Sequence, residues 1–129
     1  ASSGAVDMYT GMALSENVIA LRVARDAGLG NVVDLAQQMG INSKLDAVPG
    51  LVLGQSVVNP LEITGAYGAV ANRGVWNRPH AIVRILDSSD CKDPKDINTC
   101  REIYSHAKSS QANQQVISPG VADVLHSLL

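Results

Sequence analysis

The chain has 129 residues and a formal net charge of −2, and 46% of its residues are apolar but only 3% are aromatic. This length suggests a single domain, and high apolar content with a small net charge excludes an intrinsically disordered chain. The weakly acidic charge argues against a nucleic-acid partner, which normally requires a basic face. The longest uncharged stretch, residues 47–61, is too short to span a membrane and contains prolines and glycines.

Both ends of the sequence lack the usual boundary signals. The chain opens Ala1-Ser2-Ser3-Gly4 without an initiator Met or a secretory signal, and it stops at Leu128-Leu129 inside an apolar helical pattern. We therefore expect the chain to be a piece of a larger protein.

The first predicted element is helical. Apolar residues recur at helical spacing over residues 7–27, and Gly28 and Gly30 end the pattern. Ser15-Glu16-Asn17 interrupts the run, because Ser15 and Asn17 are weak helix formers whose side chains compete for backbone hydrogen bonds. The stretch is therefore either one helix or two helices joined by a tight corner at these residues.

Two further helices are expected in the middle of the chain. The first begins at Asn31 as its N-cap and ends at Gly40. Residues 41–58 should be irregular, because prolines and glycines punctuate them. The second helix runs over residues 59–72, with Pro60 at its first position and Glu62 at the capping-box position. Its many glycines and alanines suit tight packing inside a larger interior.

The last part of the chain predicts a β-hairpin and a final helix. Residues 81–86 form a β-branched strand, residues 101–104 are a candidate return strand, and the polar residues 87–115 suit an exposed loop. Ser118-Pro119 starts a helix with a regular apolar stripe. The predicted fold class is therefore mainly α with a β-hairpin.

The cysteines and histidines give little support for a metal site. Cys91 and Cys100 lie nine positions apart, without histidines at ligand spacing, so a zinc site is disfavoured. A disulfide closing the polar loop and a pair of free thiols both remain open. His80, His106 and His126 share no metal-ligand spacing, so we expect structural or solvated histidines and no metal or other cofactor.

The surroundings of Ser15-Glu16-Asn17 are more informative than the motif, because a lone Ser-x-Asn usually marks a cap or a turn. A collinear series of segments matches the patterns of one family. These segments are Met12–Arg22, Met39–Ile41, Leu53–Glu62, Ala66–Gly74, Pro79–Asp87 and Val116–Ala122. The series resembles the transpeptidase domain of penicillin-binding proteins and covers nearly the whole chain. Its Leu-Gly and Pro-Leu-Glu details are similar to the bifunctional, class A type.

The resemblance implies a fold, an activity and a location. Residues 1–129 would be a partial transpeptidase domain, with a polar loop insertion at 88–113, from the α/β serine penicillin-recognising fold that β-lactamases share. The parent protein would be a serine-type D,D-transpeptidase that cross-links peptidoglycan stem peptides and is acylated by β-lactams. It would work at the periplasmic face of the bacterial inner membrane, held there by segments absent from this chain.

The resemblance also implies roles for two residues. The family builds its site from three motifs: Ser-x-x-Lys, Ser-x-Asn and Lys-Thr/Ser-Gly. Ser15 would bridge the two motif lysines and pass a proton toward the leaving amine, and Asn17 would hydrogen-bond the substrate peptide. Glu16 occupies the variable position and receives no role.

The other two motifs are absent from this chain. It contains no Lys-Thr-Gly or Lys-Ser-Gly, and no Ser-x-x-Lys precedes Ser15. Ser89-x-x-Lys92 and Ser105-x-x-Lys108 follow it in polar sequence, which is the wrong order and context for a nucleophile. The nucleophile is therefore expected upstream and the third motif downstream. Alone, the fragment should be inactive and, with apolar helix faces exposed, prone to self-association or only marginally stable.

Two other functional classes remain open from sequence. The first is a non-catalytic helical interaction module that shares the pattern, and the second is a small helical DNA-binding or regulatory domain. The net charge of −2 and the lack of a basic helix disfavour the second. The flanking coding sequence would separate the first from the enzyme.

Overall fold

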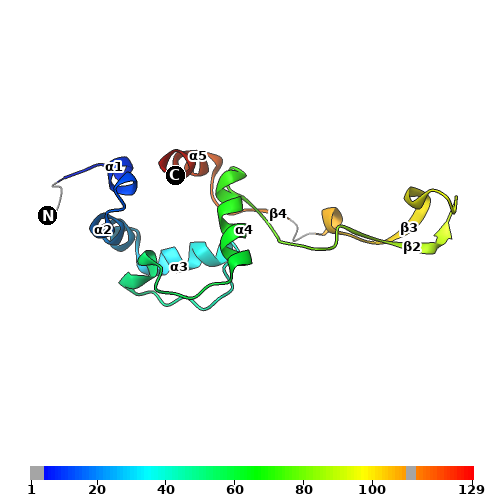
Figure 1. Ribbon diagram of the computed structural model, residues 1–129, viewed down its shortest axis with the longest axis horizontal. Coiled ribbons are helices and arrows are strands. Elements are labelled where there is room, and N and C mark those ends of the chain that lie inside the picture. The colour runs from blue at the N-terminus through cyan, green and yellow to red at the C-terminus, as the bar shows by residue number, and fades with distance from the viewer. Residues whose placement is uncertain (1–4, 110–112) are drawn as a thin grey trace. The chain divides into compact units, whose positions relative to one another are not determined.

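A computed structural model describes residues 5–109 and 113–129 of the chain (Figure 1). The described residues divide into two compact units. The helical unit comprises residues 5–76 and 115–129, and the hairpin unit comprises residues 77–109 with 113–114. The hairpin unit encloses the segment 88–113 expected as an insertion, of which residues 110–112 lie outside the described residues.

The first two helices of the helical unit meet at a corner. Helix α1 spans Met8–Ala13 and helix α2 spans Asn17–Ala27. Asp7 caps α1, because its carboxylate accepts a hydrogen bond of 2.7 Å from the Thr10 N–H. The two-helix interpretation of residues 7–27 is therefore confirmed.

Helix α3, Leu29–Gln38, starts earlier than its sequence suggests. Gly28, at φ 87°, ends α2 and is also the N-cap of α3. A glycine tolerates this backbone conformation, so one residue suffices to turn the chain. The expected stop at Gly30 and the expected N-cap at Asn31 are wrong. Both residues lie inside α3, and the Asn31 amide donates to the Ala27 carbonyl at 2.7 Å.

A largely irregular segment precedes helix α4, Pro60–Ala71, as expected. It contains one 3-10 turn, η1, at Pro49–Leu53. The predicted start of α4 is confirmed, since the Asn59 side chain accepts from the Leu61 N–H at 2.8 Å and Pro60 is the first helical residue. The Glu62 carboxylate accepts from the Ser43 hydroxyl at 2.6 Å, which ties the irregular segment to α4.

The last helix, α5, spans Pro119–Leu128 and packs against α4 and α1. The Ser118 hydroxyl accepts from the Val121 N–H at 3.4 Å, as the sequence predicts for an N-cap. Arg73 and Asp123 join the end of α4 to α5 through an ion pair of 3.1 Å.

The core of the helical unit is built from small residues. Eight of the described residues are buried, and seven of them are glycine or alanine. They are Gly11, Ala24, Gly40, Ile41, Ala66, Ala69, Gly74 and Ala122. Such residues allow backbones to approach closely, and a Cβ atom added at Gly11, Gly40 or Gly74 would come within 3.0 Å of a neighbouring atom.

The hairpin unit contains strands β2, Arg84–Cys91, and β3, Cys100–Ser105, which pair in antiparallel fashion. The return strand was expected at 101–104 and is confirmed. The strand expected at 81–86 instead begins at Arg84 and continues to Cys91. The expectation of an exposed loop is therefore wrong for residues 87–91, which belong to β2. Cross-strand partners such as Asp87 and Arg101 stabilise polar residues in a strand, which single-strand propensity does not reveal.

Short elements complete the structure. The 3-10 turns η2 and η3 lie at Ile97–Thr99 and His106–Lys108. Strands β1, Val75–Asn77, and β4, Asn113–Gln115, form a second two-stranded sheet that the sequence did not predict. The described chain is about half helical with small antiparallel sheets, so the expected mainly helical class with a hairpin holds.

Candidate functional site

The corner between α1 and α2 has the hydrogen bonds of a Schellman motif. The Ser15 N–H donates to the Met12 carbonyl at 3.0 Å, and the Glu16 N–H donates to the Gly11 carbonyl at 2.9 Å. This pattern satisfies the last carbonyl groups of α1 and requires a left-handed residue just after the helix. That residue is Ser15, with φ 52°.

Ser15 therefore occupies a position that usually carries glycine or asparagine. A side chain in this left-handed conformation costs energy, and such residues cluster at functional sites. The local structure does not favour a serine here. A role for its hydroxyl group would explain why this residue stands at the turn.

Asn17 follows two residues later as the first residue of α2. The Glu16 carbonyl accepts from the N–H groups of Ile19 and Ala20 at 3.0 and 3.1 Å, which fixes the first turn of α2. Ser15 and Asn17 both have exposed side chains, and within the described residues neither side chain makes a hydrogen bond. A hydroxyl and an amide are thus available to an external group.

A cavity of about 510 Å³ lies beside this corner, within the helical unit. Ser15, Glu16 and Asn17 supply a polar part of its lining, and mostly apolar side chains from α1, α2, α3, η1 and α5 supply the rest. These apolar residues include Met8, Met12, Ile19, Val23, Leu53 and Leu128. The geometry suits a segment or ligand that is largely apolar and has hydrogen-bonding groups at one end.

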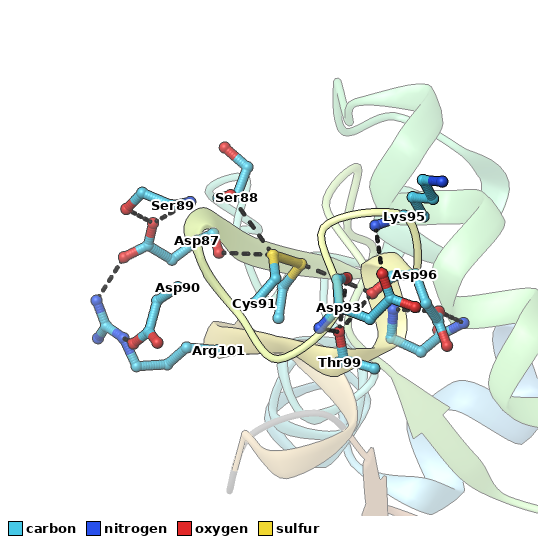
Figure 2. Close-up of a disulfide and its surroundings, with 12 residues drawn as sticks. Asp87, Ser88, Ser89, Asp90, Cys91, Asp93, Lys95, Asp96, Thr99 and Arg101 are labelled. Carbon is cyan, nitrogen blue, oxygen red and sulfur yellow. Dashed lines mark hydrogen bonds and ion pairs between the residues drawn. A yellow bond between two sulfur atoms is a disulfide. The ribbon is translucent and has the colours of Figure 1, made fainter.

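Cys91 and Cys100 are register partners in β2 and β3 and are joined by a disulfide with an S–S distance of 2.01 Å. Arg101 lies beside this bond and binds two carboxylates, Asp87 at 2.6 Å and Asp90 at 2.8 Å. Figure 2 shows this ion-pair network on one side of the disulfide. It anchors residues 88–90, where the regular register of β2 is interrupted.

The turn on the other side of the disulfide is held by side chains that bond to the backbone. The Thr99 hydroxyl lies 3.0 Å from the Asp93 N–H and 2.7 Å from the Asp96 carbonyl. The Asp93 carboxylate accepts from the Lys95 N–H at 2.9 Å, as Figure 2 shows. The tip of the hairpin is therefore ordered by polar contacts and one covalent bond.

Electrostatics in the hairpin unit follow from these contacts. The Ser89 hydroxyl and N–H, and then the Arg101 guanidinium, hold the pKa of Asp87 below its ordinary value. His80 and His106 stack with ring centroids 3.4 Å apart. Desolvation, followed by the charges of His80 and Arg78, lowers the pKa of His106.

The two late Ser-x-x-Lys patterns do not form a serine–lysine pair. The Ser89 hydroxyl donates to Asp87 at 2.6 Å, and Lys108 pairs with Glu102. Ser105 is the N-cap of the turn η3. In the part of the chain that the structure describes, no group of three or more His, Cys, Asp or Glu side chains is placed to hold a metal ion.

Sequence reasoning missed one residue that shapes the site, Gly11, and one that ties the segment before α4 to that helix, Ser43. Gly11 packs directly against α2, and Ser43 binds the Glu62 carboxylate. The signal for Gly11 was a glycine inside an otherwise helical run, where alanine is the better helix former. Ser43 carried no local signal, since its partner lies 19 residues away.

Comparison with known proteins identifies the family. The model of the penicillin-binding protein transpeptidase domain matches residues 1–129. The chain belongs to the penicillin-binding protein transpeptidase family. Penicillin-binding protein 2a of Streptococcus pneumoniae is 35% identical over 130 residues, which cover 99% of this chain and 16% of that protein. Penicillin-binding protein 1A of Rickettsia bellii is 35% identical over 101 residues, covering 75% of this chain and 13% of that protein.

The family resemblance read from the sequence is therefore confirmed. Penicillin-binding protein 2D of Bacillus subtilis is a further relative, 33% identical over 84 residues, or 65% of this chain and 12% of that protein. The chain thus spans only a small part of the length of these penicillin-binding relatives. It is a part of the penicillin-binding fold, from a family of cell-wall transpeptidases. None of the helices in residues 5–109 and 113–129 is long and apolar enough to cross a membrane.

Proposed function

We propose that this chain is the middle part of a D,D-transpeptidase that cross-links peptidoglycan stem peptides through an acyl-serine intermediate. The nucleophilic serine and the Lys-Thr/Ser-Gly strand would come from parts of a longer protein on either side of residues 1–129. The observation that carries the proposal is Ser15, held in a left-handed conformation with its exposed hydroxyl at a cavity beside Asn17.

In this mechanism the nucleophilic serine loses its proton to an adjacent base and attacks the carbonyl carbon between two D-alanines. The bond to the terminal D-alanine breaks, and that D-alanine leaves as an amine that needs a proton. The Ser15 hydroxyl can both donate and accept hydrogen bonds, so it can pass a proton toward this leaving amine. A β-lactam would acylate the same nucleophile, because its strained amide takes the place of the D-Ala–D-Ala bond.

Asn17 would orient the substrate. Its amide group has two donors and one acceptor oxygen, which match the N–H and C=O groups of a peptide. Because Asn17 is anchored in the first turn of α2, substrate binding there would cost little reorganisation of the protein. No cofactor is required for this chemistry.

The disulfide supports a location outside the cytoplasm. Disulfides persist in oxidising compartments such as the bacterial periplasm, and Cys91 and Cys100 are paired in the hairpin unit. We place the parent protein at the periplasmic face of the inner membrane, held by segments outside this chain. The motif details at Leu53-Gly54 and Pro60-Leu61-Glu62 favour the class A type.

The isolated chain should self-associate. Many large apolar side chains of the helical unit are exposed, including Met8, Tyr9, Leu14 and Val18, each more than 50% exposed. Contiguous exposed apolar surface promotes association. The partners of the parent protein would be stem peptides and β-lactams, and the net charge of −2 gives no support for a nucleic-acid partner.

The test is acylation of the full-length protein by a fluorescent penicillin. Ser15→Ala should lower the acylation rate roughly 100- to 10,000-fold, the range that a positioned proton-transfer group contributes. Ser109→Ala removes a hydroxyl group in the hairpin unit and should leave the rate unchanged. A wild-type rate in a folded Ser15→Ala protein would remove Ser15 from the mechanism.

Two further observations separate the enzyme from a non-catalytic interaction module. The isolated chain should not be labelled covalently, and stoichiometric labelling would mean that the nucleophile lies within residues 1–129. The flanking coding sequence should contain Ser-x-x-Lys upstream and Lys-Thr/Ser-Gly downstream. Absence of both would favour the interaction module.

A further inference from the structure

Gly11 stands at the base of the Ser15–Asn17 corner. It is the buried residue of α1. Its carbonyl accepts a hydrogen bond of 2.9 Å from the N–H of Glu16, the middle residue of Ser15-Glu16-Asn17. Its own N–H donates to the Asp7 carbonyl at 3.0 Å, so Gly11 is also held in the first turn of α1. The corner is thus tied to α1 through the backbone of this residue.

One side of Gly11 is in close contact with the side chain of Ile19, on α2. A Cβ atom at position 11 would lie 2.9 Å from Cδ1 and 3.0 Å from Cγ2 of Ile19, both shorter than normal carbon contacts. Alanine is otherwise the better residue inside a helix. Close contact between α1 and α2 therefore explains why a glycine occupies this position.

Ile19 belongs to the same helical turn as Asn17. The Ile19 N–H donates to the Glu16 carbonyl at 3.0 Å, so a displacement of Ile19 moves the residues that connect Ser15 to α2. The Cδ1 atom is the free end of the side chain and can turn aside, but Cγ2 is attached to Cβ, and an isoleucine in a helix has one strongly preferred χ1 rotamer. An added methyl group at position 11 would therefore push on this turn through Cγ2. A shift of about 1 Å in a catalytic group can cost roughly 100-fold in rate.

We propose that Gly11 is a positioning residue, whose missing side chain lets Ile19 hold α2 against α1 and so sets the directions of the Ser15 hydroxyl and the Asn17 amide. This inference rests on the proposed function of the corner. It makes Gly11 a determinant of the acylation step without contact to substrate. It also makes the effect of an alanine at position 11 dependent on the side chain at position 19.

The experiment measures acylation of the full-length protein by a fluorescent penicillin, with the binding constant and the acylation rate constant resolved by varying its concentration. Gly11→Ala should lower the acylation rate constant at least tenfold. Gly68→Ala, which adds a methyl group on α4 with nothing within 4 Å, should stay within twofold of wild type. A folded Gly11→Ala protein within twofold of wild type would overturn the proposal.

Rescue distinguishes positioning from a general loss of stability. Ile19→Ala removes both crowding atoms and leaves Cβ at 3.5 Å, an ordinary contact. The Gly11→Ala/Ile19→Ala protein should therefore acylate within threefold of Ile19→Ala alone. A double variant that is at least tenfold slower than Ile19→Ala, or that does not fold, contradicts the proposal. This comparison also decides the case if Gly11→Ala alone does not fold.

Ser15→Ala separates failure of this inference from failure of the proposed function. If Ser15→Ala acylates slowly and Gly11→Ala normally, the role of Gly11 is wrong and the role of Ser15 stands. If Ser15→Ala acylates at the wild-type rate, the proposed function of the corner fails, whatever Gly11→Ala does.

Discussion

The helical unit and the hairpin unit are stabilised in different ways. All eight buried residues of the described chain lie in the helical unit, and none lies in the hairpin unit. The helical unit depends on close contacts at glycines and alanines, whereas the hairpin unit depends on a disulfide and on ion pairs around Arg101. The first should be sensitive to side-chain volume, and the second to redox state and charge.

This difference bears on function because the candidate catalytic residues lie in the helical unit. A corner supported by glycine contacts gives Ser15 and Asn17 fixed positions, which a catalytic site requires. A hairpin held by polar contacts can vary in length and sequence with little effect on that corner. Volume changes should therefore affect the corner, and reduction should affect the hairpin alone.

The largest effect is expected for Gly74→Ala, at the end of α4. Gly74 has φ 87°, and a Cβ atom would overlap the Ile117 carbonyl oxygen, which cannot move without its backbone. We expect a loss of more than about 4 kcal/mol in the free energy of unfolding, measured by chemical denaturation of the full-length protein.

Gly68→Ala on α4 is the matched control for this change. Nothing lies within 4 Å of the added carbon, so alanine should raise stability by about 0.5–1 kcal/mol. Similar losses in the two variants would contradict the account of the helical unit.

Removal of the disulfide should have the next largest effect, and only in the hairpin unit. Closing a loop of about ten residues contributes roughly 2.7 kcal/mol by the chain-entropy estimate, a factor of about 100 in an equilibrium constant. Cys91→Ala/Cys100→Ala should therefore reduce hydrogen-exchange protection of the β2–β3 amides about 100-fold. Protection of α2 and α4 should be unchanged.

Reduction of the wild-type protein is the control for the cysteine variant and should give the same pattern. Loss of protection in α2 or α4 under either condition would show that the two units are not independently stabilised. Unchanged protection in β2 and β3 would mean that the disulfide does not support the hairpin.

The smallest effect is a pH dependence within the helical unit. The Ser43 hydroxyl, with smaller contributions from the backbone N–H groups of Ser43, Asn59 and Asn42, lowers the pKa of Glu62. The unfolded chain then binds more protons than the folded chain near the ordinary glutamate pKa of about 4.3. The stabilisation is full above this value and is lost as the pH falls through the lower folded-state pKa.

The stability difference between wild type and Glu62→Gln should therefore be larger at pH 7 than at pH 3. Denaturation midpoints at the two pH values measure this difference. An equal difference at both values would mean that the charge of Glu62 does not contribute to stability, since a glutamine has almost the same shape.

Local signals in the sequence were sufficient for several elements. The caps at Asn59 and Ser118 act within three residues, so their helices were predicted with the correct starts. A corner at Ser15–Asn17 was one of two interpretations of residues 7–27, because Ser15 and Asn17 are weak helix formers. The family was recognised because six segments kept their order along the chain.

Contacts between distant residues account for what was missed. The polar half of β2 is strand because of partners in β3, such as Arg101 for Asp87. The approach of Gly11 to Ile19 depends on the angle between two helices, which no single helix encodes. The start of helix α3 at Leu29 depends on the backbone conformation of Gly28, and a glycine in the sequence indicated only the end of the preceding helix.

The most direct test of the central claim is Ser15→Gly in the full-length protein, with acylation rate and melting temperature measured together. Glycine suits the left-handed turn, so stability should equal or exceed that of wild type. Acylation by a fluorescent penicillin should nevertheless fall roughly 100- to 10,000-fold, because the hydroxyl group is lost. A Ser15→Gly protein that acylates at the wild-type rate would contradict the assignment of Ser15 to the site.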